Sequence, residues 1–355
     1  MSVAAPASEP SGASSIGPAA GRFRVALVGL LLALVGLVVF ACTVGKYPVA
    51  PTDLLAALAD RLGLPADSLP VAVKSVVWEI RLPRIAAALL VGAGLAASGA
   101  SFQTMFRNPL VAPDILGVSA GAAFGAALGL SLGLPVAAVQ LLAFAFGLLS
   151  VLTVFWVSRT VRGHEPTLVL VLTGVVVGAL FGAGTSLLKV LADPYNTLPA
   201  IVFWLMGSLA STTAGDVGLA FPAMALGLAV LAAVRWRINL LALPDDEAAS
   251  LGADVWRLRV LAIAAATLVT SAAVSISGVI GWIGLLVPHL SRFLVGPEFS
   301  RLLPISVAMG AGFLLLVDTM ARTLAPMEIP LGILTSCLGA PVFLYLLIVS
   351  GRETS

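Results

Sequence analysis

Long apolar stretches recur along the whole chain, and they constrain its fold more than any other feature. Each stretch of about 20 apolar residues is long enough to cross the hydrocarbon core of a bilayer as a helix. The chain is 60% hydrophobic and only 10% charged. A transmembrane barrel is excluded, because its strands would alternate apolar and polar residues with a period of two. The sequence therefore predicts an all-α polytopic membrane protein.

This pattern predicts about ten membrane spans. We place them at residues 23–43, 84–105, 114–131, 135–158, 167–189, 215–234, 256–276, 280–294, 303–323 and 330–349. The longest break, residues 44–83, carries Pro48, Pro51, Pro65 and Pro70 and a helical stretch near Asp53–Arg61. A second break, residues 190–214, holds the apolar segment 198–210, which is too short to span. We expect this segment to form an interfacial or re-entrant helix.

The two ends of the chain differ from the spans in composition. Residues 1–21 are mostly Ala, Ser, Pro and Gly with almost no charge, and such a composition cannot bury a core. We therefore expect a disordered tail at 1–21, a membrane domain at 22–350 and a short C-terminal segment at 351–355.

Basic residues predict the orientation of the chain in the membrane. If the N-terminus is cytoplasmic, 12 of the 19 Lys and Arg residues face the cytoplasm and 7 face the other side. This excess agrees with the positive-inside rule. An even number of spans then places both termini in the cytoplasm.

Two segments of the sequence resemble each other faintly. "GLAASGASFQTMFRNPL" (94–110) and "AAVSISGVIGWIGLLVPHL" (272–290) each contain small residues ending in Ser-Gly, then an apolar run and a proline. The predicted spans place the two copies in opposite directions across the membrane. Inverted repeats of this kind are typical of transporters.

Few ionisable residues fall within the predicted spans. A secondary transporter coupled to protons or sodium normally needs such residues there. Asp216, Asp318, Glu328 and Arg322 all lie at or near predicted helix ends. An ion-coupled secondary transporter is therefore the less favoured alternative.

The sequence also lacks the residue sets of an enzyme or an ATPase. A membrane enzyme needs a nucleophile, an acid–base pair or a metal set, and we find none. Two cysteines and two histidines provide neither a disulfide framework nor a multi-histidine metal site. There is no phosphate-binding loop, since Lys46 precedes Tyr47 and Lys74-Ser75 lacks the preceding glycine. Any energy for uphill transport must enter through another chain.

The acidic segment 244–252 stands out in this apolar chain. Asp245, Asp246 and Glu247 follow Pro244, and Gly252 follows shortly after. Pro suits the first position of a helix, acids suit the positive end of its dipole, and Gly suits its stop. We predict a short helix here, whose apolar surface is formed by Ala248, Ala249 and Leu251. It is either a solvated connector or a helix that fits a groove on a partner protein.

Three long segments resemble the signatures of the FecCD family, the membrane subunits of importers for iron chelates, haem and cobalamin. They are "RLPRIAAALLVGAGLAASGASFQTMFRNPLVAPDILGVSAGAAFGAALG" (81–129), "SGVIGWIGLLVPHLSRFLVGPEFSRLLP" (277–304) and "EIPLGILTSCLGAPVFLYLL" (328–347). The acidic helix ending in "SLG" is similar to the family's cytoplasmic coupling segment. The resemblance covers roughly residues 24–350.

The resemblance implies the type II ABC importer permease fold, with ten spans per subunit and a homodimer around one central pathway. It implies a non-catalytic subunit in a bacterial cytoplasmic (inner) membrane. Two separate ATP-binding cassette subunits would bind ATP and Mg, so this chain itself needs no cofactor, and a periplasmic or extracellular substrate-binding protein would deliver the cargo. Membrane lipid is the remaining partner, and no nucleic acid is expected. A ferric siderophore is the first candidate cargo, ahead of haem, cobalamin and molybdate.

Site residues follow from the same resemblance. The family's docking arginines match Arg81, Arg84 and Arg322, although arginines at helix ends also anchor at lipid headgroups. The segment that couples to the ATPase matches Asp245, Asp246, Glu247, Ala248, Leu251 and Gly252. Residues expected to serve helix packing near the pathway are Asn108, Pro109, Gly117, Ser119 and Gly121. We expect His289 to bond a backbone group rather than a ligand.

Overall fold

A computed structural model of the chain describes residues 18–61, 70–161 and 166–353, and every regular element in these ranges is helical. The α-helices are α1 (Pro18–Thr43), α2 (Pro51–Arg61), α3 (Val71–Ser75), α4 (Leu82–Met105), α5 (Val118–Ser131), α6 (Val136–Thr160), α7 (Pro166–Leu191), α8 (Thr197–Leu205), α9 (Ala214–Ile238), α10 (Asp245–Ser250), α11 (Val255–Ser277), α12 (Ile283–Val295), α13 (Phe299–Thr323) and α14 (Leu331–Glu353). Three further turns are η1 (Val76–Arg81), η2 (Pro113–Leu116) and η3 (Asn239–Ala242).

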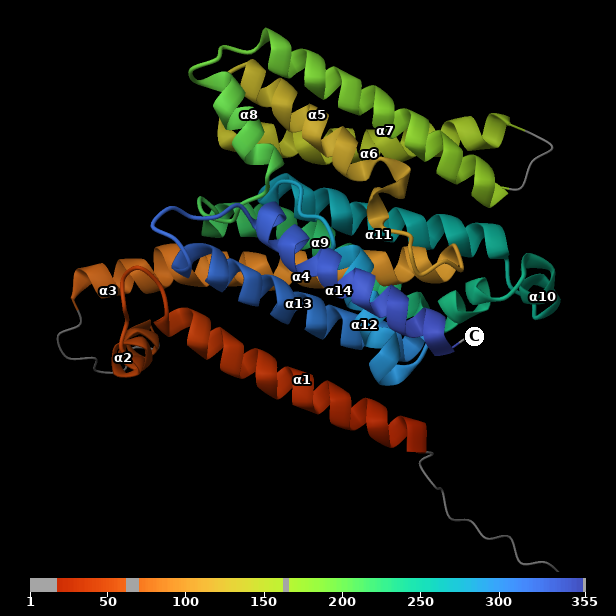
Figure 1. Cartoon of the computed structure of the whole chain (residues 1–355), viewed down its shortest axis with the longest axis horizontal. Helices are drawn as coiled ribbons and strands as arrows, with labels where there is room; N and C mark the ends of the chain where they lie inside the picture. The colour runs from red at the N-terminus through yellow and green to blue at the C-terminus, as the bar shows by residue number, and fades with distance from the viewer. Residues whose placement is uncertain (1–17, 62–69, 162–165, 354–355) are drawn as a thin grey trace, which may run out of the picture.

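Ten of these helices lie alongside one another and correspond in order to the ten predicted spans (Figure 1). Seven are long and apolar enough to cross a membrane, and the apolar parts of α5, α12 and α14 are shorter. The short helix predicted in the second break is α8, which packs on α5. The prediction of an all-α membrane fold is confirmed.

The predicted boundaries need correction at three places. Helix α1 begins at Pro18, so the last residues of the expected tail are helical, while residues 1–17 lie outside the described part. Helix α14 continues to Glu353, into the expected C-terminal segment. The break expected over 44–83 is wrong for its last part, because one continuous helix runs from Val71 to Met105. Its turns over Val76–Arg81 are π-helical, which lets the helix pass the position of Pro83.

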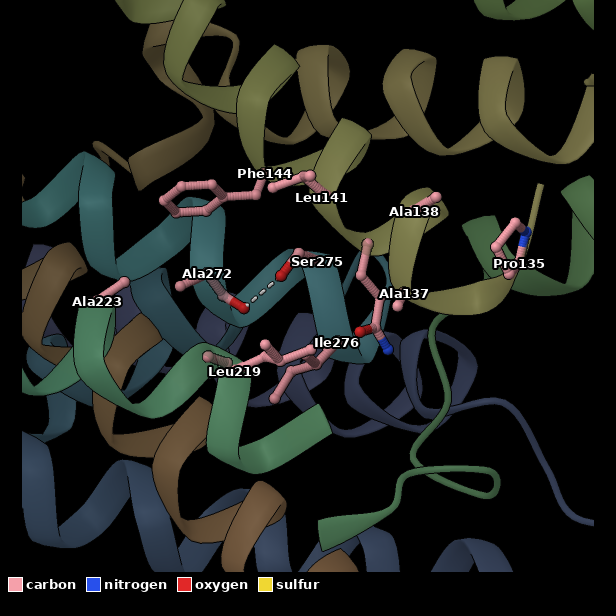
Figure 2. A pocket seen from close by; sticks show the side chains of 12 residues that line it. Pro135, Ala137, Ala138, Leu141, Phe144, Leu219, Ala223, Ala272, Ser275 and Ile276 are labelled. Carbon is pink, nitrogen blue, oxygen red and sulfur yellow. Dashed lines mark hydrogen bonds between the residues drawn. The ribbon is translucent and has the colours of Figure 1, made fainter. Parts of the chain in front are cut away.

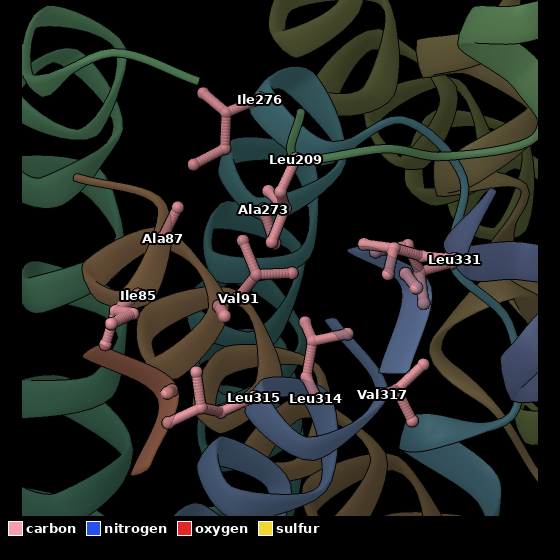
Figure 3. Close-up of a cluster of buried hydrophobic side chains, with 14 of the residues drawn as sticks. Ile85, Ala87, Val91, Leu209, Ala273, Ile276, Leu314, Leu315, Val317 and Leu331 are labelled. Carbon is pink, nitrogen blue, oxygen red and sulfur yellow. The ribbon is translucent and has the colours of Figure 1, made fainter. Parts of the chain in front are cut away.

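Helix α4 lies at the centre of the bundle. It packs against α13, α11, α12 and α9, and 20 of its 24 residues are buried. Figure 3 shows part of this core, where Val91 of α4 lies between Ala273 of α11 and Leu314 of α13. In contrast, α5, α6, α7 and α8 form a second group that joins the rest mainly through α11 (Figure 1).

Glycines bring the central helices into backbone contact. A Cβ atom on Gly99 of α4 would lie 1.9 Å from the backbone oxygen of Gly284 in α12. A Cβ atom on Gly92 would lie 2.2 Å from the backbone oxygen of Gly310 in α13. Small residues permit such approaches in membranes, where helices associate by close packing rather than by the hydrophobic effect. Gly99 and Gly284 belong to the two similar segments of the sequence, so these segments contact each other at the centre of the bundle.

The contact at Gly99 yields a stability prediction. We expect Gly99→Ala to lower the free energy of unfolding by about 1–3 kcal/mol, because the added methyl group forces α4 and α12 apart. Thermal unfolding of the purified protein in detergent measures the effect. Gly29→Ala in α1 is the matched control, since nothing lies within 4 Å of the added methyl group. Equal unfolding midpoints for the two variants would refute the backbone contact.

Candidate functional site

Charged residues gather at the two ends of the helix bundle, and the candidate site has a part at each end. We call these the α2 end, where α2 and α3 lie, and the α10 end, where α10 lies (Figure 1). The first residue of α1 and the last residues of α14 both lie toward the α10 end (Figure 1). The two ends differ in how their charges are partnered.

At the α2 end, Arg84 joins α4 to α13 and to the loop after it. Its Nε donates to both carboxylate oxygens of Asp318, at 2.9 and 3.1 Å. Its Nη1 lies 2.9 Å from a carboxylate oxygen of Glu328. The side chain of Asp318 is fully buried and that of Arg84 is 7% exposed. Asp318 lies five residues before the end of α13, near the helix end as predicted, but it is fully buried there.

Two further arginines lie beside this pair, and one of them, Arg322, approaches the same carboxylate. Arg322 lies one turn after Asp318, with its Nε 3.8 Å from Oδ2, and its Nη2 donates to the Ala41 carbonyl at 2.7 Å. Arg81 donates to the carbonyl oxygens of Cys42 and Tyr47. These three arginines, with Asp318 and Glu328, form what we call the arginine cluster. It ties the end of α1 to α4 and α13.

The burial of the arginine cluster limits which of its residues a docking protein could contact. Arg81, Arg84 and Arg322 are all buried, so their placement differs from the outward one expected from the sequence. Arg322 nevertheless lines a cavity of about 280 Å³ whose other residues include the exposed Lys46. The docking role of the three arginines stays a prediction.

At the α10 end, the predicted acidic helix forms as α10, Asp245–Ser250. Pro244 is its N-cap, and its first turn holds the three acids, near the positive end of the helix dipole. Gly252 adopts φ +82° and donates its N–H to the Ala249 carbonyl at 2.9 Å. Ala253 donates to the Ala248 carbonyl at 3.2 Å, which completes a Schellman stop. The helix forms and stops where it was predicted, although Pro244 is its N-cap and not its first residue.

The side chains of α10 divide into an inner and an outer set. Asp245 accepts bonds from Arg259 of α11 at 2.9 and 3.1 Å and lies 3.7 Å from Arg107, which follows α4. Ala248 is fully buried, so the expectation that it belongs to an exposed apolar surface is wrong.

Three side chains of the predicted coupling segment face outward. Asp246 and Glu247 are exposed, and Leu251 is 63% exposed. The structure therefore brings Asp245 and Ala248 toward the protein and leaves the other three available to a partner.

The segment 108–121 combines an exposed turn with a tightly packed helix start. Asn108 and Pro109 are exposed near α10, so they do not serve the helix packing expected of them. Gly117 has φ +74°, and an added Cβ there would lie 2.8 Å from Ser150 Oγ. At Gly121 the added Cβ would lie 2.4 Å from the Phe146 carbonyl oxygen.

Ser119 of the same segment has a local bond. Its hydroxyl donates to the carboxylate of Asp114, which ties the start of α5 to η2. Packing of α5 against α6 thus accounts for Gly117 and Gly121, and this local bond accounts for Ser119.

The backbone bond expected of His289 is not found among the described residues. Both ring nitrogens are buried without a hydrogen-bond partner there. The ring lies between Phe293 and Phe343, with centroids 5.3 and 6.0 Å away. Aromatic packing therefore replaces the expected bond.

Several partners were not recognised in the sequence. Arg259 and Arg107 hold α10, and Gln103 donates to the backbone of Gly284 and Leu285 while accepting from Arg292. Their sequence separations from these partners exceed the reach of any local motif. For the pairs of Asp245 with Arg259 and Arg107, the one available signal in the sequence was that an acid and two bases lie at the same predicted end of the membrane spans.

The arginine cluster yields the second stability prediction. We expect Asp318→Asn to lower the free energy of unfolding by about 3–5 kcal/mol, because it leaves buried guanidinium groups without their central carboxylate. Equilibrium unfolding in mixed micelles measures this loss. Glu79→Gln is the control, because Glu79 is exposed at the same end of the bundle.

A double variant makes the prediction specific to the pair. Asp318→Asn combined with Arg84→Gln should cost less than the two single losses added together, since each partner is then removed with the other. Strict additivity would mean that the two side chains do not interact.

Comparison with known proteins places the chain in a family. The model of the FecCD transport family matches residues 27–349. The molybdate import permease MolB of Haemophilus influenzae is 41% identical over 320 residues, covering 89% of this chain and 93% of that protein. The cobalamin import permease BtuC of Halobacterium salinarum is 44% identical over 279 residues, covering 78% of this chain and 74% of that protein.

A solved structure supports the same assignment. It is described as an inward-facing conformation of a metal-chelate type ABC transporter, and it shares 39% identity with this chain. The match has a TM-score of 0.82 and covers 92% of this chain and 99% of that chain. With a family model and relatives that span most of its length, this chain belongs to the FecCD transport family of ABC importer permeases.

Proposed function

We propose that this chain is the permease subunit of a binding-protein-dependent importer that carries a metal chelate, with a ferric siderophore as first candidate. The observation that carries the proposal is its 39% identity, over almost the whole length, to a transporter described as metal-chelate type. The cargo would cross a bacterial inner membrane in a pathway formed by two copies of the chain.

Molybdate is the second candidate cargo. A relative named for molybdate import is 41% identical and is matched over 93% of its length. Molybdate is a small oxyanion, whereas a siderophore is a bulky chelate, so the two candidates differ in size and charge.

We further propose that a separate ATPase pair binds ATP and Mg and drives the cycle through α10. The exposed Asp246, Glu247 and Leu251 supply a polar and apolar surface for a partner's groove. On the inner side of α10, Ala248 is buried and Asp245 pairs with Arg259 of α11 and Arg107 after α4. A movement of α10 would therefore be transmitted to α11 and to the turn after α4. The arginines gathered at the α10 end favour a cytoplasmic location for this end.

A substrate-binding protein would dock on the α2 end. In this proposal Arg322 and Lys46 present positive charge in their shared cavity, while Arg81 and Arg84 hold the surrounding loops through the arginine cluster. Charged groups in such an interface set orientation and encounter rate more than affinity.

The coupling role predicts the effect of reversing charge on α10. We expect Asp246→Lys combined with Glu247→Lys to abolish co-purification of the ATPase, because both exposed acids then repel any complementary basic surface. The control is Glu79→Lys, a reversal of an exposed acid at the opposite end. Thermal unfolding confirms that each variant is folded, and undiminished ATPase binding by the folded double variant would refute the role of α10.

The cargo is tested by uptake into proteoliposomes that contain the permease, its ATPase and its binding protein. We expect ATP-dependent accumulation of a radiolabelled ferric siderophore, with molybdate, haem and cobalamin compared in parallel. Accumulation of molybdate alone would replace the first candidate with the second. Uptake that persists without the ATPase and stops when an ion gradient is collapsed would instead support the secondary-transporter alternative.

A further inference from the structure

Two apolar cavities lie end to end between the same three helices. The outer cavity, of about 550 Å³, lies toward the α2 end between α6, α9 and α11, as Figure 2 shows. The inner cavity, of about 660 Å³, lies toward the α10 end between the same helices. Together they form a groove with α11 as its floor and α6 and α9 as its walls.

The inner cavity arises from the packing of the two helix groups. Both α6 and α9 pack on α11, yet Gly227 of α9 and Ala264 of α11 fill little of the space between them. The walls carry exposed apolar side chains, Leu152 and Trp156 on α6 and Leu226 on α9. An apolar cavity within the membrane-spanning part of the bundle needs an apolar occupant, because the side chains that line an empty space lose dispersion contacts.

A side-chain hydrogen bond spans the outer cavity. Gln140 of α6 donates to Asp216 of α9 at 2.8 Å, which bridges the two walls. At the inner cavity, the described residues provide no side-chain bond between α6 and α9. The lining of the outer cavity contains no basic residue, whereas that of the inner cavity includes Arg159.

Arg159 stands at the mouth of the inner cavity, at the last turn of α6. Its guanidinium lies 5.8 Å from the ring centroid of Trp256, which in turn packs edge-on against Phe155. Tryptophan is enriched at membrane interfaces, where its ring meets the headgroups. The mouth of the cavity thus has the composition of a headgroup site.

Two further arginines lie on the same helix faces as residues that line the inner cavity, nearer to its mouth. Arg237 is seven residues after the lining residue Val230 of α9, and Arg257 is three residues before the lining residue Val260 of α11. Both are exposed. Asp254 pairs with Arg257 at 3.0 Å, so these three arginines and one acid leave two positive charges in excess.

We propose that the inner cavity is a binding site for an anionic glycerophospholipid of the adjacent leaflet. Its acyl chains would fill the space between α6 and α9, and its phosphate would accept charge-assisted hydrogen bonds from Arg159, Arg237 and Arg257. Basic pockets between membrane helices recognise anionic headgroups in this way. The lipid would join α6 to α9 at the end where the described part of the chain provides no side-chain bond between these two helices.

The test measures lipid binding to the delipidated full-length protein by native mass spectrometry, with phosphatidylglycerol and phosphatidylcholine as probes. We expect the wild-type protein to prefer phosphatidylglycerol and to gain thermal stability from it. The triple variant Arg159→Gln, Arg237→Gln, Arg257→Gln should lose this preference, by about five-fold for each arginine removed. The matched control, Arg22→Gln with Arg24→Gln, removes exposed arginines at the same end on α1 and should keep the preference.

A second variant tests the groove without changing charge. Ala264 is exposed in the cavity, so Ala264→Phe should occupy the acyl-chain space and lower the binding of both lipids while the chain stays folded. An unchanged preference in the triple variant, or unchanged lipid binding in Ala264→Phe, would overturn the proposal.

A third measurement distinguishes lipid from a second copy of the chain. Leu152→Cys, in a background with Cys42 and Cys337 replaced by serine, reports whether another copy covers the groove. Efficient disulfide dimers through this position would assign the groove to a protein interface and overturn the lipid site. Their absence, together with phosphatidylglycerol binding, supports it.

Discussion

The close approach of backbones around α4 is the constraint on which the rest of the structure depends. Within a bilayer the hydrophobic effect does not drive helices together, so association relies on close packing and on polar contacts. Gly92 and Gly99 let α4 touch α13 and α12 at their backbones, and these contacts fix the centre of the bundle. The other helices are then placed by their packing on this centre.

Polar contacts complete this arrangement at both ends of α4. At the α2 end, Arg84 holds α4 to Asp318 of α13, and at the other end Gln103 holds it to the backbone of α12. A buried ion pair adds little net stability, yet losing one partner costs several kcal/mol. These contacts therefore specify which helices meet α4 and in which register, while close packing provides most of the attraction.

The spans were predictable from the sequence because hydropathy and length act along the chain. The course of α4 beyond Pro83 was not, since the π-helical turns over Val76–Arg81 depend on what the helix packs against. The exposure of Arg81 and Arg84 was also misjudged, because their partners Cys42, Tyr47 and Asp318 are distant in sequence. At α10, Pro244 and Gly252 mark the start and stop of the helix locally, so the sequence was enough to predict them. The burial of Ala248 depends on where α11 lies, which the sequence does not show.

The contacts of α10 connect the candidate coupling surface to the centre of the bundle. Asp245 is bonded to Arg259, near the start of α11, and lies close to Arg107, just after α4. Both of these helices are largely buried, and they pack against each other. A force applied at the exposed Asp246 and Glu247 would therefore reach α4 and α11 before it reached α6 and α7, which are more exposed. Because the backbone contacts at Gly92 and Gly99 join α4 to α13 and α12, they cannot absorb such a force by side-chain rearrangement. We infer that α4, α12 and α13 move as one body.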